Sequence, residues 1–498
     1  MKKFIYTILA AASMMSAVSC EGWLTTNPSS SVSDNQVFVS EKGAQAALNG
    51  CYNLIAFSYG GGGRPDTQGW VAQILANDVD GEDIIVNGGW YGYDYNMWGH
   101  QRGDIFKASA LWFYYYNIIN NVNSIIEYTP KIDGVTESDI AGVMGEAYAM
   151  RGWCYFNLIQ YFQHTYVLAH ERNMPGVPIY TEPTTDQTEG KGRGTIDQTY
   201  DQIISDLKEA EKLLDGQTRS AKNHFDKSVV EGLLARVYLV MNDWSKAADY
   251  AAKARAGYPL TSAEDWDAGF NSIDTRSWMW GMMVDAEHTL EANGDYGPFA
   301  MWTNYITRDG GDFWSFNCFY LNDKFAELFS ADDIRGKQIW WKEDVGLHCS
   351  NKFYDTPDLT GDFVFMRSDE MLLIEAEAKS RLGDDEAAAA LLNELRGLRN
   401  ATLTQTIGSS LLEEIITERR KELYGEGFAW FDLIRLQRGI SREGNHSNFG
   451  GKTPVPARSW RFVYQIPQNE IINNPNIDSA NWPAGDQNIF GDVSLCLE

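Results

Sequence analysis

A helix–turn–helix pattern that occurs twice is the feature that most constrains how this chain can fold. The first copy covers residues 228–259, and its spacing is set by Leu234, Ala235, Tyr238, Ala247, Ala254 and Pro259. The second copy covers residues 369–400, where Ala376 and Ala388 repeat the spacing of Ala235 and Ala247. Small residues at these positions let two neighbouring helices cross closely. The pattern therefore predicts two pairs of packed helices.

The spacing of both copies is that of a tetratricopeptide (TPR) repeat, a helix pair of about 34 residues. Asn242-Asp243 is expected to make the turn of the first copy, and Pro259 to end its second helix. Gly383-Asp384 is expected to make the turn of the second copy, which departs from the usual pattern at Lys379 and Leu395. Two repeats alone do not stabilise a solenoid, so earlier helices must pack beside them.

Apolar periodicity predicts these earlier helices. With the two repeats, the expected helices cover about residues 41–56, 107–128, 140–163, 196–214, 228–257 and 369–400. Residues 258–366 do not follow a helical pattern, and they carry seven tryptophans among scattered Gly, Asp and Asn. The sequence thus predicts a mainly α fold: a TPR-like helix-pair (α–α superhelix) scaffold with long irregular loop-rich insertions and short strands. Insertions of this length are usually functional.

The first twenty residues predict export. Lys2 and Lys3 precede a mostly apolar stretch, which closes with Ala17-Val18-Ser19-Cys20. Small residues before such a cysteine resemble a bacterial lipobox, so residues 1–19 are expected to be a signal peptide and Cys20 to be lipidated. An ordinary signal peptide cleaved near the same point is the alternative. Residues 20–40 are expected to form a flexible tether, and residues 41–498 a single domain.

The composition excludes several classes of protein. A formal net charge of −27 argues against nucleic-acid binding and against electrostatic attachment to an anionic membrane. No CxxC pair or His/Cys cluster is present, so neither a metal nor another cofactor is expected. Cys154 is expected to be a buried free thiol, and Cys318 and Cys349 are a possible disulfide pair.

Four groups of residues, in order behind the lipobox, resemble the SusD/RagB family of outer-membrane nutrient-binding lipoproteins. The groups are Trp112-x3-Tyr116-x2-Ile119-x3-Asn123; Glu146-x4-Arg151 with Tyr155-Phe156-x-Leu158; Glu418-Arg419, Glu422-Leu423, Glu426-Gly427 and Asp432-Leu433-Ile434-Arg435, within a C-terminal segment 411–477; and Ile466-Pro467, Glu470 and Asn474-Pro475. The chain departs from the family at Gln163-His164-Thr165-Tyr166, where Gly-x-x-Pro is usual, and over residues 478–498.

The resemblance implies four TPR-like helix pairs with irregular loops packed against them. It also implies a lipid-anchored protein on the cell surface, at the outer membrane. Such proteins bind oligosaccharides, or peptides in some branches, and pass them to a SusC-type TonB-dependent transporter. A peptide-binding member and a TPR scaffold without its own ligand are the alternatives.

Two aromatic segments are the candidate glycan site. Sugar rings present apolar faces and polar edges, so their sites combine flat aromatic side chains with hydrogen-bonding groups. Residues 90–98 hold five aromatics interleaved with Gly, Asp and Asn, and residues 302–314 hold a second group. The candidates are Trp90, Tyr93, Asp94, Asn96, Trp98, Trp302, Tyr305, Arg308 and Trp314. Core packing of the first segment is the alternative interpretation.

Other prominent residues are expected to be structural. Trp278 and Trp280 alternate in an apparent strand, and Trp112, Trp153 and Trp244 lie in helices, so all five are expected in the core. The charged residues from Glu418 to Arg435 are expected to form salt bridges that hold the last helix to the body. No GxSxG, HExxH or phosphate-binding glycine loop is present, so we expect no enzymatic activity. A glycosidase remains a rival, because pairs of carboxylates are too common here to be informative.

Overall fold

The computed structural model describes residues 37–57, 69–86, 91, 103–284, 319–354, 360–445 and 454–477. Its helices dominate. They are α3 (Glu41–Phe57), α4 (Gly69–Val79), α6 (Phe106–Tyr128), α7 (Glu137–Phe162), α8 (Tyr166–Glu171), α9 (Ile196–Leu213), α10 (Lys227–Val240), α11 (Trp244–Ala254), α12 (Ala263–Ala268), α15 (Asp323–Ala326), α16 (Ser368–Arg381), α17 (Asp385–Leu398), α18 (Gly408–Leu423), α19 (Ala429–Arg435) and α20 (Gln468–Asn473), with short 3-10 turns between some of them.

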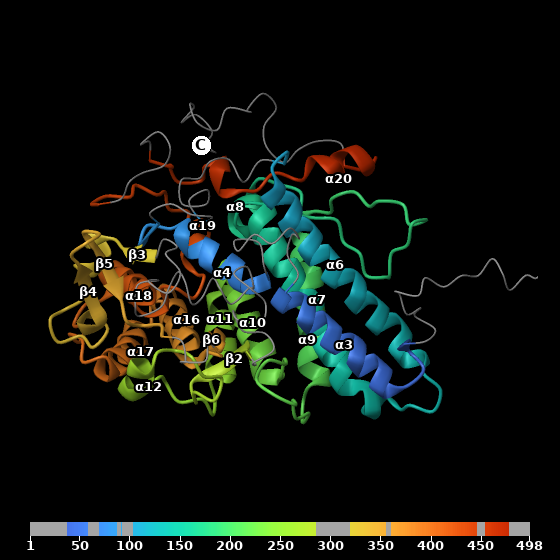
Figure 1. Cartoon of the computed structure of the whole chain (residues 1–498), viewed down its shortest axis with the longest axis horizontal. Helices are drawn as coiled ribbons and strands as arrows, with labels where there is room; N and C mark the ends of the chain where they lie inside the picture. The colour runs from blue at the N-terminus through green and yellow to red at the C-terminus, as the bar shows by residue number, and fades with distance from the viewer. Residues whose placement is uncertain are drawn as a thin grey trace, which may run out of the picture.

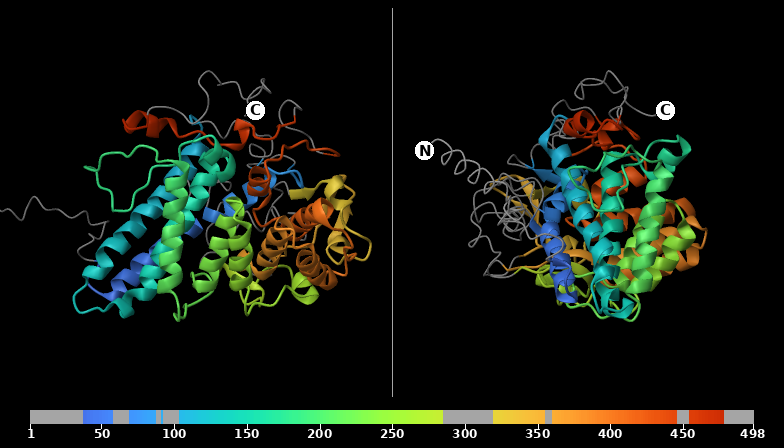
Figure 2. Two further views of the ribbon diagram at one scale, coloured as in Figure 1. Left: turned by 180° about the vertical axis from the view of Figure 1, so that it is seen from behind. Right: turned by 90° about the vertical axis from the view of Figure 1, so that its right-hand side faces the viewer.

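Eight of the helices in this described part pack in chain order, each on the next: α3, α6, α7, α9, α10, α11, α16 and α17. They make the four pairs that the family resemblance implied. Figure 1 shows the early pairs at one end of the molecule and α16, α17 and α18 with several strands at the other end, and Figure 2 shows the same order from behind. The prediction of a mainly α, TPR-like scaffold is therefore confirmed.

The two predicted turns share one local geometry. Asn242 and Gly383 adopt positive φ angles of 59° and 82°, which end the first helix of each pair. Asp243 and Asp384 follow, and each accepts a hydrogen bond from the backbone of the second helix. The alanines that were expected at the helix crossings are fully buried. The sequence thus identified both the turns and the contacts.

The insertion between the two repeats leaves the helix stack and returns to the same place. Helix α11 packs directly on α16, although the insertion separates them in sequence. Strands β2 (Trp278–Met282) and β6 (Phe363–Arg367) pair antiparallel close to the two ends of the insertion. The side chains of Arg236 and Arg255 reach across to Glu370 and Glu375 of α16. The scaffold therefore continues past the insertion.

A second sheet contains four strands in the order β1-β3-β5-β4. The strands are β1 (Ile84–Val86), β3 (Phe319–Leu321), β4 (Ile339–Lys342) and β5 (Leu347–Ser350). All of its neighbouring strands run antiparallel. The first strand comes from the N-terminal half of the chain and the other three from the insertion. This sheet thus joins the insertion to the early part of the chain.

Most predictions about core residues are confirmed. Trp112, Trp153, Trp278 and Trp280 are buried, with at most 2% of their surface exposed. Cys154 is a buried free thiol. Cys318 lies outside the described residues, so its pairing with the buried Cys349 stays a prediction.

The prediction that Trp244 lies in the core is wrong, because this residue is only partly buried and packs against the edge of the core. It is the first residue of α11, and the guanidinium of Arg381 lies 4.5 Å from its ring centroid. Because no helical turn of α11 precedes Trp244, one side of its ring has no helical neighbour to cover it. The residue thus lies where the core meets solvent.

Candidate functional site

The predicted glycan-binding residues lie outside the described residues, as does Cys20. They fall in two segments, residues 87–102 and 285–318, of which only Tyr91 is described. The residues on either side of these segments are described, and they show where on the body each segment begins and ends.

Both segments are attached to the same end of the four-stranded sheet. Val86 is the last residue before the first segment, and Phe319 is the first residue after the second. These two residues are direct partners in the antiparallel pair β1–β3. The Cα atoms of such partners lie about 5 Å apart. Two segments that are more than 180 residues apart in sequence are therefore joined to the sheet at two neighbouring residues.

Tyr91 holds the first segment to this point. It is fully buried, and its ring meets the ring of Phe319 edge-on at a centroid distance of 5.3 Å. Its hydroxyl donates a long hydrogen bond of 3.5 Å to the carbonyl oxygen of Ala72 in α4. Tyr91 belongs to the aromatic run 90–98, for which core packing was the alternative interpretation. Its burial shows that at least one aromatic of this run packs in the core.

Val284, the last described residue before the second segment, is also held in place by a hydrogen bond. The backbone N–H of Val284 donates to the carboxylate of Asp362 at 2.9 Å, and the N–H of Ile273 donates to the same carboxylate at 2.8 Å. The pairing of β2 with β6 supports this contact. Ordered structure thus frames the second aromatic segment on both sides.

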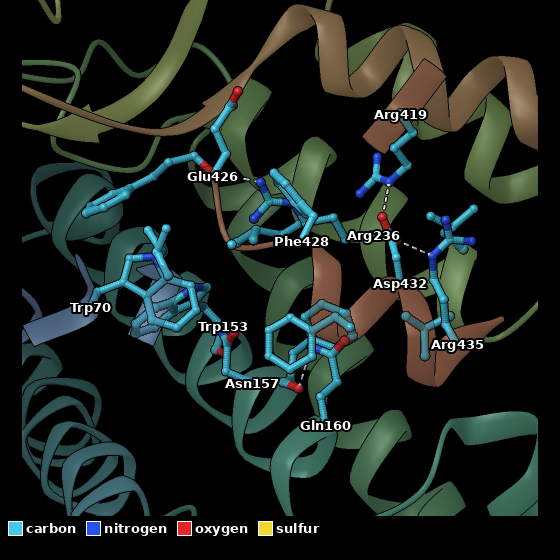
Figure 3. Close-up of a pocket in the computed structure, with 18 residues that line it drawn as sticks. Trp70, Trp153, Asn157, Gln160, Arg236, Arg419, Glu426, Phe428, Asp432 and Arg435 are labelled. Carbon is cyan, nitrogen blue, oxygen red and sulfur yellow. Dashed lines mark hydrogen bonds and ion pairs between the residues drawn. The ribbon is translucent and has the colours of Figure 1, made fainter. Parts of the chain in front are cut away.

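An aromatic cavity lies between α4, α7, α10 and α19, and Figure 3 shows its lining. Its volume is about 60 Å³, whereas pockets for small ligands usually measure about 300 to 1,000 Å³. The buried N–H groups Trp153 Nε1 and Arg419 Nη1 line it and make no hydrogen bond within the described part of the chain. The cavity has room for a few ordered water molecules but not for a sugar ring.

The arginines around this cavity are bound to carboxylates. Arg236 forms a bidentate pair with Glu370, and Arg435 forms one with Glu377. Asp432 lies between Arg419 and Arg435 and accepts from both, at 2.7 and 2.6 Å (Figure 3). Because these charges are paired, the cavity is part of the packing of α19 rather than a binding site.

Comparison with known proteins identifies the fold and the family. Residues 73–239 match the SusD-like family model described as starch-binding and associating with the outer membrane, and residues 349–483 match the SusD family model. Together the two matched ranges span more than half of the chain. The chain belongs to the SusD family.

Relatives in the SusD family span nearly the whole chain. SusD-like protein P38 of Formosa agariphila is 23% identical over 552 aligned residues, covering 96% of this chain and 99% of that protein. A SusD-like carbohydrate-binding protein of Bacteroides vulgatus has a crystal structure with a TM-score of 0.79 and 28% identity, covering 89% of this chain and 98% of that one. A laminarin-binding SusD-like protein shares the fold, with a TM-score of 0.66 and 22% identity over 87% and 97% of the two chains.

The charged segment that most resembles the SusD family forms a buried ion-pair network. Glu422 accepts hydrogen bonds from Arg335, Arg367 and Arg399, at distances of 2.6 to 3.0 Å. The side chains of all four residues are completely buried. Burial alone would raise the pKa of Glu422, but the guanidinium groups of Arg399 and Arg367 hold it well below its ordinary value. The expected salt bridges are confirmed.

The network has no geometry for acid–base catalysis. Glu418 pairs with Arg335 and Arg396, and Glu426 pairs with Lys352 and Arg367. Each carboxylate is therefore neutralised by fixed cations and has no exposed oxygen for a substrate. The SusD family models and structures describe carbohydrate-binding proteins, and these residues stabilise such a body.

Other residues of the SusD-like motifs also have structural roles. Asn123 donates to the carbonyl oxygens of Tyr180 and Glu182 and accepts from Arg151, which pairs with Asp206 at 2.6 Å. These contacts hold the loop between α8 and α9 against α6 and α7. Asn123 and Arg151 of the motifs therefore hold the scaffold together.

The pair Arg435–Glu377 predicts a specific dependence of stability on pH. Burial would raise the pKa of Glu377, but Arg435 and Arg381 lower it to about 2 from 4.5. A carboxyl group with a lowered folded-state pKa stabilises the fold above its unfolded pKa, and this stabilisation is lost as the pH falls toward 2. We expect Glu377→Gln to cost about 3 kcal/mol of unfolding free energy at pH 7.

Urea denaturation at a series of pH values measures this effect. The difference between wild type and Glu377→Gln should be about 2 kcal/mol smaller at pH 3 than at pH 7, because the wild-type carboxyl is then almost fully protonated in the unfolded state. A difference that stays constant from pH 7 to pH 3 would show that the pair does not lower this pKa.

Proposed function

We propose that this SusD-family protein is a non-catalytic, surface-exposed lipoprotein of the outer membrane. It binds oligosaccharides or polysaccharides and delivers them to a SusC-type TonB-dependent transporter. The observation that carries the proposal is the β1–β3 pairing, which attaches both aromatic segments to one end of the sheet. The laminarin-binding and carbohydrate-binding proteins with the same fold support a glycan as the ligand.

The two segments supply complementary groups for a sugar. Aromatic rings offer flat surfaces for the C–H faces, and the polar side chains between them bind hydroxyl groups. The proposed aromatic surfaces are Trp90, Tyr93, Trp98, Trp302, Tyr305 and Trp314. The proposed hydrogen-bonding partners are Asp94, Asn96 and Arg308. No single strong contact is required, because many stacked contacts together give useful affinity.

The proposed anchor is Cys20, which connects the body to the membrane through its lipid chains. Two or more lipid chains make attachment durable, while a flexible tether lets the body move. No helix in the described part of the chain is long and apolar enough to cross a bilayer. A protein that stays with its transporter and also moves aside to open it needs both a durable anchor and a flexible tether.

Affinity electrophoresis with a panel of polysaccharides tests the proposal. The gels contain starch, laminarin, xylan, pectin or no polysaccharide, and bovine serum albumin is the non-binding control. At least one polysaccharide should retard the protein by twofold or more relative to the control. Equal mobility in all gels, together with saturable binding of a peptide mixture, would favour the peptide-binding alternative and contradict the glycan proposal.

A further inference from the structure

A second recess lies far from the four-stranded sheet, beside helix α6. It has a volume of about 300 Å³ and is lined by α6, the loop between α8 and α9, and α20. Figure 1 shows α20 and this loop next to α6, at the end of the molecule away from β3, β4 and β5, and the reverse view in Figure 2 agrees. This recess, called the α6 groove below, is therefore separate from the point where the two aromatic segments are attached.

Aromatic rings form one wall of the α6 groove. Phe113 is 55% exposed, which is unusual for an aromatic residue on a helix of the scaffold. Tyr116 follows one turn later, with its ring 4.9 Å from that of Trp112 and 5.9 Å from that of Tyr180. Rings three residues apart on a helix face the same side. The exposed ring of Phe113 and the partly exposed ring of Tyr116 thus give the wall an apolar surface on which a sugar ring can stack.

Neutral polar groups and one carboxylate form the rest of the lining. Asn120 accepts hydrogen bonds from Thr184, and its own NH₂ group makes none to the described residues. The side chain of Asn473 is exposed and makes no hydrogen bond to them either. Glu470 accepts from Asn474 through one oxygen only. Amide donors and a free carboxylate oxygen beside an aromatic wall match the hydroxyl groups of a saccharide.

The groove is a rigid feature of the fold. Asn474 donates to the carbonyl oxygen of Lys191, and the N–H of Lys191 donates to the hydroxyl of Tyr180. A Cβ atom on Gly190 would lie 2.5 Å from the side chain of Asn474, so the loop and α20 fit together only with glycine there. Binding to such a preformed recess costs little ordering of the chain.

We infer that the α6 groove is a second saccharide-binding site, which takes one or two sugar units of an oligosaccharide. Tyr116 and Phe113 stack on the ring, and Asn120, Asn473 and Glu470 bind its hydroxyl groups. The lining favours a saccharide over a peptide, because its described residues include no free strand edge to pair with a peptide backbone. The α6 groove consists of described residues and contains no residue of the two aromatic segments.

Hydrogen–deuterium exchange with mass spectrometry tests each site separately in one experiment. The full mature chain carrying Cys20→Ala is mixed with maltohexaose, laminarihexaose or cellohexaose. We expect at least one of them to slow exchange by twofold or more in peptides from residues 181–192. The double variant Phe113→Ala, Asn473→Ala should abolish this protection. Phe106→Ala, which removes an exposed ring of the same helix outside the groove, should preserve it.

The outcomes distinguish the two proposals. Protection of residues 87–102 and 285–318 alone would overturn the α6 groove and leave the proposed function intact. Protection of residues 181–192 alone would support the groove and contradict the proposed site. Protection of 181–192 by an extended peptide but by no hexaose, or protection of neither region by any hexaose, would overturn the groove. Equal melting temperatures of the variants, measured by circular dichroism, exclude misfolding as the cause.

Discussion

Replacing Glu422 with glutamine is expected to lower the free energy of unfolding by about 3 to 5 kcal/mol. The carboxylate is fully buried and bridges Arg335, Arg367 and Arg399. Three guanidinium groups would keep their positive charges without this partner, in a region from which water is excluded. Removing one member of a buried ionic network leaves uncompensated charge, which is far more costly than losing a surface pair. Chemical denaturation followed by circular dichroism measures the effect.

Glu413→Gln is the matched control. Glu413 lies on the same helix and pairs with Arg438, but its side chain is 59% exposed. Surface pairs contribute about 0 to 1 kcal/mol, so this variant should be nearly as stable as wild type. A loss of less than 1 kcal/mol for Glu422→Gln would mean that the network is not needed to hold α18 to the body.

Trp98→Ala and Trp314→Ala are each expected to weaken glycan binding by tenfold or more. A stacked tryptophan contributes about 1.5 to 3 kcal/mol through the apolar surface that it buries, and 1.4 kcal/mol is a factor of ten in affinity. The melting temperature should not change, because the proposed role of both rings is to contact ligand rather than the core. Calorimetric titration with the oligosaccharide of the best-binding polysaccharide measures the affinity.

Trp341→Ala is the control for these variants. Trp341 is a 43% exposed tryptophan on β4, outside the two aromatic segments. Its replacement should change the affinity by less than twofold. If Trp98→Ala or Trp314→Ala lowers the melting temperature by several degrees, that tryptophan belongs to the core, and the alternative interpretation of its segment is correct.

The helix pairs could be predicted because their signals are local. A left-handed residue followed by aspartate marks the turns at Asn242-Asp243 and Gly383-Asp384, and alanines mark the crossings. Helix α4 was missed for the opposite reason. All eleven of its residues are buried, including the polar Gln73, Asn77 and Asp78, so no face of this helix meets solvent. Burial of polar residues together with apolar ones removes the match between residue type and exposure on which the prediction of a surface helix depends.

The partners of the charged segment could not be predicted from its own spacing. The spacing of Glu418, Glu422 and Glu426 predicted salt bridges that hold the last helix to the body, but it did not identify the partners of these carboxylates. In the structure their main partners include Arg335 and Arg367, which come from the insertion and from β6. Tertiary packing brings these residues together over more than 50 positions in sequence. The network was correctly predicted to be structural. Which residues take part in it could be known only from the fold.

The candidate site was predicted from the composition of two segments together with the family resemblance, and the fold relates the two segments to each other. Aromatic residues interleaved with Gly, Asp and Asn indicated two candidate segments, but nothing in either segment related one to the other. The pairing of Val86 with Phe319 does so. The identity of the bound glycan depends on the angles between the rings, and residue types do not determine these angles.

A single titration tests the central claim most directly. The mature chain carrying Cys20→Ala is titrated by calorimetry with the oligosaccharide of the best-binding polysaccharide, and the sugar is then recovered and analysed by chromatography. The account predicts saturable binding and an oligosaccharide of unchanged length. Binding of a peptide mixture without any binding of glycan, or recovery of shortened sugar products, would contradict it.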